Sequence, residues 1–147
     1  MTTTARRFFT LVVVLTGTLA LVGCGPDRPD TVPVTGRVTL AGGDWPVKGI
    51  IIFTPVEATA GYPKRPGRAI FDLEGNFVVT TFTEGDGLIP GTYRAVIQCG
   101  QPVTDMETPT VSYVPSNYES PALSGLELTV PANSSPIEVE YDIAVAQ

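Results

Sequence analysis

The sequence predicts an all-β protein, a seven-stranded antiparallel β-sandwich that follows an amino-terminal export signal. Apolar and polar residues alternate with a period of two in several short stretches, which is the pattern of half-buried strands. The 14 prolines are scattered, and because each lacks an amide donor, no long helical pattern survives beyond residue 30. Glycine, aspartate and asparagine separate the alternating stretches, as expected of tight turns between antiparallel strands.

The first part of the chain is typical of a secretory signal peptide. Arg6 and Arg7 precede an apolar run over residues 8–22, and small residues stand at its end. The alternative is an uncleaved transmembrane helix, but the run is shorter than the about 20 apolar residues that such a helix needs. Gly25 and Pro26 follow almost directly, and proline disfavours continuation of a helix. We therefore expect export followed by cleavage.

The four residues at this point, Leu21-Val22-Gly23-Cys24, resemble the lipobox of bacterial lipoproteins. The resemblance implies cleavage between Gly23 and Cys24 and a lipid on the Cys24 sulfur, which would anchor the exported protein to a membrane. It divides the chain into a signal peptide at 1–23, a lipidated tether at 24–31 and a sandwich domain at 32–146. Gly25 stands where inner-membrane lipoproteins carry aspartate, so the outer membrane is favoured over the inner one. Sec export and twin-arginine export both stay open.

The first half of the domain begins with an alternating stretch at 31–40, where valine and leucine occupy one face and threonine and arginine the other. This pattern predicts the first strand. Residues 49–53 are apolar throughout, as in a central strand that is covered on both faces. Pro55 is expected to end that second strand, and a long loop at 56–67 follows it.

A hairpin is predicted next, with strands at 68–71 and 77–82. Asp72 can accept hydrogen bonds from the backbone of the turn, and Gly75 can supply the positive φ that a bulged turn requires. A second polar loop then leads to a strand at 92–99, which opens after a proline and a glycine.

The last third of the chain is less regular. Residues 100–123 are rich in proline, and an irregular connection of this length is unusual in a compact domain. Two final strands follow at 126–130 and 137–143, and in the second of them three acidic residues alternate with apolar ones. The expected total is seven short strands with turn signals between them, which is typical of a β-sandwich.

The strand motifs lie at 34–40, 47–53 and 72–77, the last being an aspartate-to-glycine turn before an aromatic strand. This order resembles the carboxypeptidase regulatory-like domain, a transthyretin-like sandwich of immunoglobulin-like architecture. Two further motifs, Pro90-Gly91-Thr92-Tyr93 and Val114-Pro115-Ser116-Asn117-Tyr118, are similar to those of short planctomycetal lipoproteins with this domain. The resemblance implies a non-catalytic accessory module without active-site residues to transfer.

Composition excludes several classes of chemistry. The sequence has no histidine, so mechanisms that use an imidazole base and histidine-bound metals are excluded. Removal of Arg6 and Arg7 with the signal leaves seven basic residues against fifteen acidic ones, and an acidic surface repels nucleic acids. Cys99 is the second of two cysteines and is expected to be a small buried residue, with an intermolecular disulfide or a reactive thiol as alternatives. No cofactor and no metal site is expected.

Two carboxylate hypotheses remain as rivals. Glu138, Glu140 and Asp142 share one face of the last strand, where a hydrolase with paired carboxylates is conceivable but a solvated surface is the simpler interpretation. Calcium could use the acidic turns, whose residues are Asp72, Glu74, Asn76, Glu84 and Asp86. Turn chemistry explains those residues without a metal.

Four aromatic residues fall in expected loops and are the candidate binding residues: Trp45, Tyr62, Tyr113 and Tyr118. Together they could contact a glycan or a protein, and singly each could cap the core. We therefore expect a non-catalytic, lipid-anchored protein of the cell envelope that contacts protein or glycan. The alternatives are a carboxylate-based hydrolase or calcium-dependent envelope enzyme, and assembly with another sandwich through an edge strand.

Overall fold

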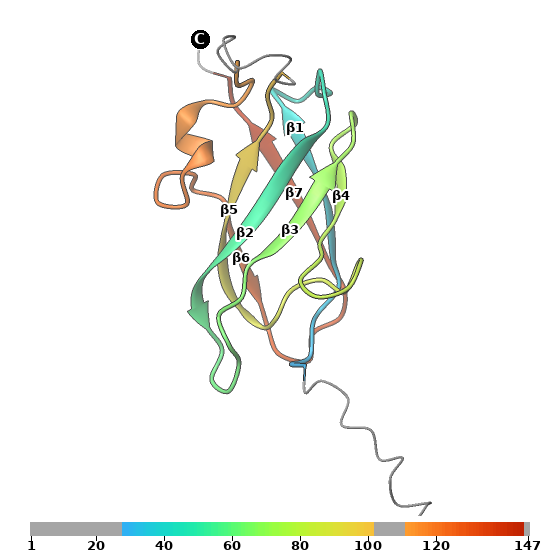
Figure 1. Ribbon diagram of the computed structural model, residues 1–147, viewed down its shortest axis with the longest axis vertical. Helices are drawn as coiled ribbons and strands as arrows, with labels where there is room; N and C mark the ends of the chain where they lie inside the picture. The colour runs from blue at the N-terminus through green and yellow to red at the C-terminus, as the bar shows by residue number, and fades with distance from the viewer. Residues whose placement is uncertain (1–27, 102–110, 146–147) are drawn as a thin grey trace, which may run out of the picture.

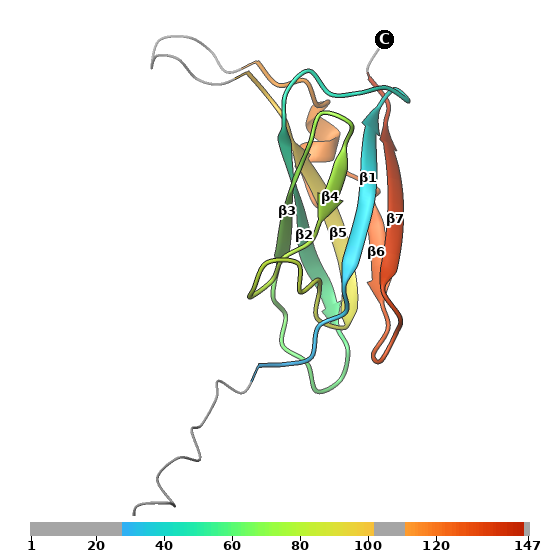
Figure 2. The same ribbon diagram turned by 90° about the vertical axis from the view of Figure 1, so that its right-hand side faces the viewer.

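The structure is a computed structural model that describes residues 28–101 and 111–145. Two sheets pack face to face, as Figures 1 and 2 show from two directions. The expected signal peptide, Gly23 and Cys24 lie outside the described residues. The strands are β1 (Val34–Leu40), β2 (Gly49–Ala58), β3 (Gly67–Phe71), β4 (Asn76–Val78), β5 (Gly91–Gln98), β6 (Glu127–Val130) and β7 (Ile137–Ile143). The seven-stranded all-β sandwich is therefore confirmed.

The strand order is β4-β1-β7 in the smaller sheet and β3-β2-β5-β6 in the larger one. Most neighbouring strands are antiparallel, as expected, but β1 and β7 run parallel over seven residue pairs from Val34↔Ile137 to Leu40↔Ile143. The prediction of a purely antiparallel sandwich is wrong at this pair. Because β1 and β7 are the first and last strands, no hairpin connection constrains their relative direction.

Two strand boundaries also differ from the expectation. β2 continues past Pro55 to Ala58, and the register shifts between Pro55 and Glu57 where β2 pairs with β5. An irregularity of this kind lets a strand accommodate a proline. β4 is shorter than expected, because beyond Val78 the chain turns into the polar loop that leads to β5.

The core lies between the sheets and is formed by alternate residues of the strands. In β3, for example, Gly67, Ala69 and Phe71 are buried while Arg68 and Ile70 are exposed. The largest side chains that are fully buried are Tyr93, Phe53, Phe71, Ile51, Leu88, Ile89, Ile97 and Ile143. Among the described residues, every member of the core cluster falls between residues 32 and 143.

The loop between β4 and β5 is organised around one carboxylate. Asp86 accepts hydrogen bonds from the backbone N–H groups of Thr81 (2.7 Å), Phe82 (2.9 Å) and Thr83 (2.9 Å). Desolvation would raise the pKa of Asp86, but these hydrogen bonds outweigh it and hold the pKa below its usual value. Asp86, one of the residues of the calcium hypothesis, therefore stabilises the backbone of this turn.

The long segment before β6 has more structure than expected. Gly100 and Ser112 form a β-bridge, and a short 3-10 helix, η2, spans Ser116–Glu119. The helix η2 lies beside β5 in Figure 1, and Val96, an outward-facing residue of β5, is buried. Within the described ranges, no helix has the length and apolar character to cross a membrane.

Candidate functional site

The four aromatic residues expected to form a binding site do not come together. Trp45 is only 3% exposed and belongs to the core. Its indole N–H donates to the carbonyl of Val38 at 2.6 Å, and its ring centroid lies 4.8 Å from that of Phe71. The prediction of Trp45 as a ligand-binding residue is therefore wrong, because its ring and its polar atom are both used inside the protein.

The three tyrosines are partly buried and occupy two separate places. Tyr62 lies in the β2–β3 loop at one end of the sandwich, whereas Tyr113 and Tyr118 accompany η2 near the other end and pack against the core. Tyr113 and Tyr118 thus act as caps of the core, which was the other expectation for these residues. A shared aromatic platform for a sugar is not present among the described residues.

A groove lies between β3 and β4 on the described surface. Its origin is a hairpin that is closed at both ends and open in the middle. Arg68 and Thr80 exchange two backbone hydrogen bonds of 2.9 Å, and the Asp72 N–H donates to the Asn76 carbonyl at 3.1 Å. Between these closures, no backbone hydrogen bond in the described ranges joins Ile70 to the facing Val78.

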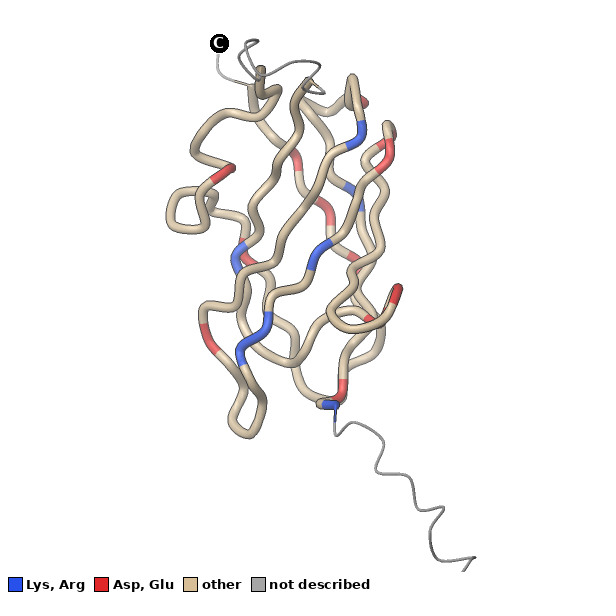
Figure 3. The backbone as a smooth tube through the Cα atoms, viewed as in Figure 1, with Lys and Arg blue, Asp and Glu red and all other residues tan. Residues whose placement is uncertain are grey.

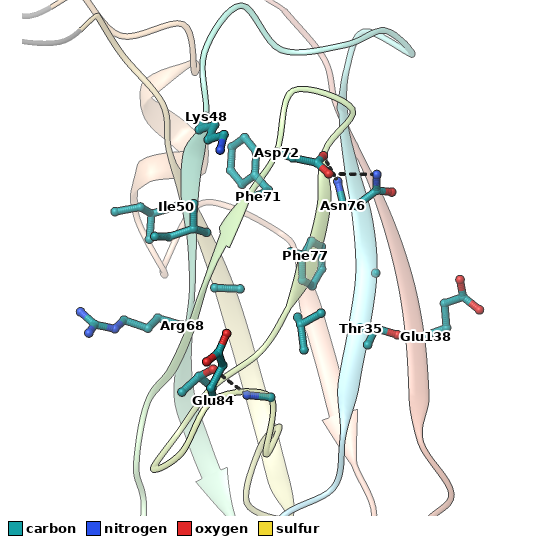
Figure 4. Close-up of a pocket in the computed structure, with 16 residues that line it drawn as sticks. Thr35, Lys48, Ile50, Arg68, Phe71, Asp72, Asn76, Phe77, Glu84 and Glu138 are labelled. Carbon is teal, nitrogen blue, oxygen red and sulfur yellow. Dashed lines mark hydrogen bonds between the residues drawn. The ribbon is translucent and has the colours of Figure 1, made fainter.

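The opening follows from the way the hairpin divides between two sheets. β3 pairs with β2 in the larger sheet, while Val78 of β4 pairs with Thr35 of β1 in the smaller one. The two strands of the hairpin are therefore drawn to different layers. The result is a groove of about 1000 Å³, with Phe71 and Phe77 between the strands (Figure 4).

Apolar side chains stand at the rim of this groove. Ile70 is 69% exposed, Val78 is 53% exposed and Ile50, which pairs with Ile70 across β2 and β3, is 39% exposed. The rings of Phe71 and Phe77 are buried, so they form a floor and do not offer a free face. A cluster of exposed apolar side chains on the surface of a folded domain is typical of an interaction site.

The charges around the groove are divided between its sides. Lys48 and Arg68 lie on the β2–β3 side, whereas Glu138 lies on the opposite side and Glu84 at one end (Figures 3 and 4). Asp72 also lines the groove, and its carboxylate accepts from the Asn76 N–H at 2.8 Å. Desolvation would raise the pKa of Asp72, but the hydrogen bonds from Asn76 and the turn backbone hold it below its usual value.

The described groups offer little for covalent chemistry. Within residues 28–101 and 111–145, no group of three His, Cys, Asp or Glu side chains is arranged to hold a metal ion. Cys99 is buried, as expected, its thiol lies 3.4 Å from the Val47 carbonyl, and burial raises the pKa of the thiol. Asp142 accepts hydrogen bonds from the Gly42 N–H and the Thr39 hydroxyl, so its carboxylate serves the fold.

The groove was not predicted from the sequence, although one signal pointed toward it. Residues 49–53 are apolar on both faces of β2, a pattern that predicts burial on both faces. On the outer face of β2, Ile52 is partly buried and Ile50 is exposed. An apolar strand face without a covering element is the pattern that could have identified the site.

Comparisons with known proteins assign no family. No family model and no curated protein matches the sequence. Among solved structures, the chain is similar to part of a 9R-lipoxygenase from Cyanothece PCC8801, with 12% sequence identity and a TM-score of 0.36. The match covers 92% of this chain and 20% of the lipoxygenase chain.

Proposed function

We propose that the protein is an exported, lipid-anchored module of the cell envelope that binds another protein through the β3–β4 groove and carries out no catalysis itself. The single observation that supports the binding role is the group of exposed apolar side chains at the groove, Ile50, Ile70 and Val78. The lipobox-like residues that end in Cys24 support the anchor. The resemblance to carboxypeptidase regulatory-like domains, which act as accessories, agrees with both parts.

A protein partner suits this groove better than a glycan. Sugars are bound by stacking on the faces of exposed aromatic rings together with polar groups. Here the two aromatic rings of the groove are buried, and the exposed groups are branched aliphatic side chains. Aliphatic side chains surrounded by charges of both signs are typical of a protein–protein contact, with an apolar centre and a polar rim.

The groove is tested with a variant that removes the exposed apolar surface and preserves the strands. We expect the double variant Ile50→Thr/Ile70→Thr to fold with nearly unchanged stability, because threonine also favours strands and both sites face solvent. Capture of an envelope protein by cross-linking from membrane extracts should fall about tenfold, since central apolar residues dominate such interfaces.

The matched control carries the same chemical change elsewhere. Val56 and Leu123 are 37% and 67% exposed and lie outside the groove, so Val56→Thr/Leu123→Thr should retain capture. Equal loss in both double variants, or no loss in either, would refute the groove as the binding site.

The anchor has a separate test. Replacement of Cys24 by serine should abolish incorporation of a fatty-acid probe and leave the protein uncleaved or detached from membranes, because the thioether needs the Cys24 sulfur. Cys99→Ser is the matched control, and it should label as strongly as the parent because Cys99 is buried in the domain. Labelling of the Cys24→Ser protein at the parental level would disprove lipidation at this residue.

A further inference from the structure

β7 is an edge strand, and within the described ranges no strand pairs with its outer side. Figure 2 shows β7 at the border of the smaller sheet, beside β1. The hydrogen bonds of Ile137 and Ile143 run inward, since the Ile137 N–H donates to the Pro33 carbonyl at 2.9 Å and the Ile143 carbonyl accepts from Ala41 at 2.8 Å. Because backbone groups alternate along a strand, those of Glu138, Glu140 and Asp142 point outward.

The inner face of the same strand is incompletely covered. Ile137, Val139 and Tyr141 pack against the core but are only partly buried, in contrast to the fully buried Val34 and Val38 of the neighbouring β1. β6, the adjacent edge of the larger sheet, has only four residues. The sheets therefore leave a row of apolar side chains half open at this border, and one more strand beside β7 would cover it.

The side chains on the outer face of β7 are acidic, so an added strand with basic side chains would complement them. Glu138, Glu140 and Asp142 are exposed on it. Among the described residues, neither Glu138 nor Glu140 forms a salt bridge, and Arg37, which is in register with Glu140, instead donates to the Glu74 carbonyl at 2.7 Å. The two glutamates are thus available for cations on a neighbouring strand.

A second copy of this chain is a poor occupant at neutral pH. Antiparallel pairing of two β7 strands about Glu140 would place Glu140 opposite itself and Glu138 opposite Asp142. Like charges directly opposite each other destabilise a strand pair. This arrangement is also the means by which natural sheets prevent edge-to-edge association.

We propose that the outer edge of β7 accepts an extended segment of a partner protein in which Lys or Arg alternates with apolar residues. The backbone of that segment would pair with the outward N–H and C=O groups of Glu138, Glu140 and Asp142. Its basic side chains would face the carboxylates, and its apolar side chains would cover the row that begins at Ile137. This site shares Glu138 with the far side of the β3–β4 groove, but it uses none of the groove's exposed apolar side chains.

The test measures hydrogen exchange of the purified full chain with blocked synthetic peptides. The probes are TKVKVKVT, its acidic counterpart TEVEVEVT, and TKVPPKVT, in which two adjacent prolines remove a pairing N–H whether the peptide runs antiparallel or parallel to β7. Without peptide, the amides of Glu138, Glu140 and Asp142 should exchange rapidly, whereas those of Val139 and Tyr141 should be protected. The basic peptide should slow the first set at least about tenfold, and the acidic and proline peptides should not.

Two variants of the protein separate charge from backbone pairing. The double variant Glu138→Lys/Glu140→Lys should reverse the peptide preference, so that TEVEVEVT protects the edge and TKVKVKVT does not. Asp142 is left unchanged in this variant because its carboxylate accepts structural hydrogen bonds. As the control, Glu74→Lys/Glu84→Lys makes the same change of net charge away from β7 and should leave the preference unchanged.

Three results would overturn the proposal. The first is protection of the Glu138, Glu140 and Asp142 amides before any peptide is added, because the edge would then already be paired. The second is equal protection by the basic and acidic peptides, and the third is no protection by any peptide. The other two tests change Cys24 and the pair Ile50 and Ile70, none of which belongs to the β7 edge, so they can succeed or fail independently.

Discussion

Replacement of Gly75 by alanine will destabilise the domain by at least about 3 kcal/mol and can prevent its folding altogether. Gly75 has φ of +86° and ends the turn between β3 and β4. A Cβ atom at this position would occupy the same space as the carbonyl oxygen of Val38 in the neighbouring β1. The backbone cannot yield at low cost there, because the Val38 N–H donates to the Gly75 carbonyl at 3.0 Å.

Gly42→Ala is the matched control for this substitution. Gly42 also has a positive φ, +73°, but no atom lies within 4 Å of the place that its Cβ would occupy. Alanine there bears only the cost of the left-handed conformation, about 1–2 kcal/mol. Urea unfolding followed by circular dichroism measures both free energies of unfolding. Equal effects of the two substitutions would mean that the close approach of β1 and the turn is not present.

The sequence predicted the parts of this fold that depend on local chemistry. Period-two alternation, together with the continuous apolar run at 49–53, located all seven strands, and Asp72 with Gly75 identified the β3–β4 turn. It did not predict the parallel pairing of β1 with β7, because two strands that are distant in the sequence carry no local sign of their relative direction. The continuation of β2 beyond Pro55 was missed for a related reason, since a bulge depends on the partner strand.

The candidate site was harder to predict than the strands. The groove exists because one hairpin divides between two sheets, so that Ile70 and Val78 face each other without pairing. This property belongs to the topology and not to either segment alone. The aromatic candidates failed for the opposite reason, because a loop position such as that of Trp45 gives no local indication that the side chain turns inward.

The corrected role of Trp45 leads to the second large effect. Replacement of Trp45 by alanine should reduce the free energy of unfolding by about 3–5 kcal/mol, as expected when a large buried aromatic is removed. The ring fills the end of the core against Phe71, and the indole N–H binds the Val38 carbonyl. Tyr62→Ala is the control, because Tyr62 is a partly exposed loop residue at the other end of the sandwich, and its loss should cost less than about 1 kcal/mol.

Trp45→Phe divides the effect into its packing and hydrogen-bonding parts. The Val38 carbonyl lies on the β4 side of β1, where the Gly75 N–H cannot reach it because that group donates to Asp72 within the turn. The indole N–H therefore satisfies a carbonyl that the sheet leaves without a partner. Phenylalanine fills much of the same space but supplies no donor, so we expect a loss of about 1–3 kcal/mol, the cost of one unsatisfied buried polar group. A Trp45→Phe protein as stable as the parent would show that packing alone accounts for Trp45.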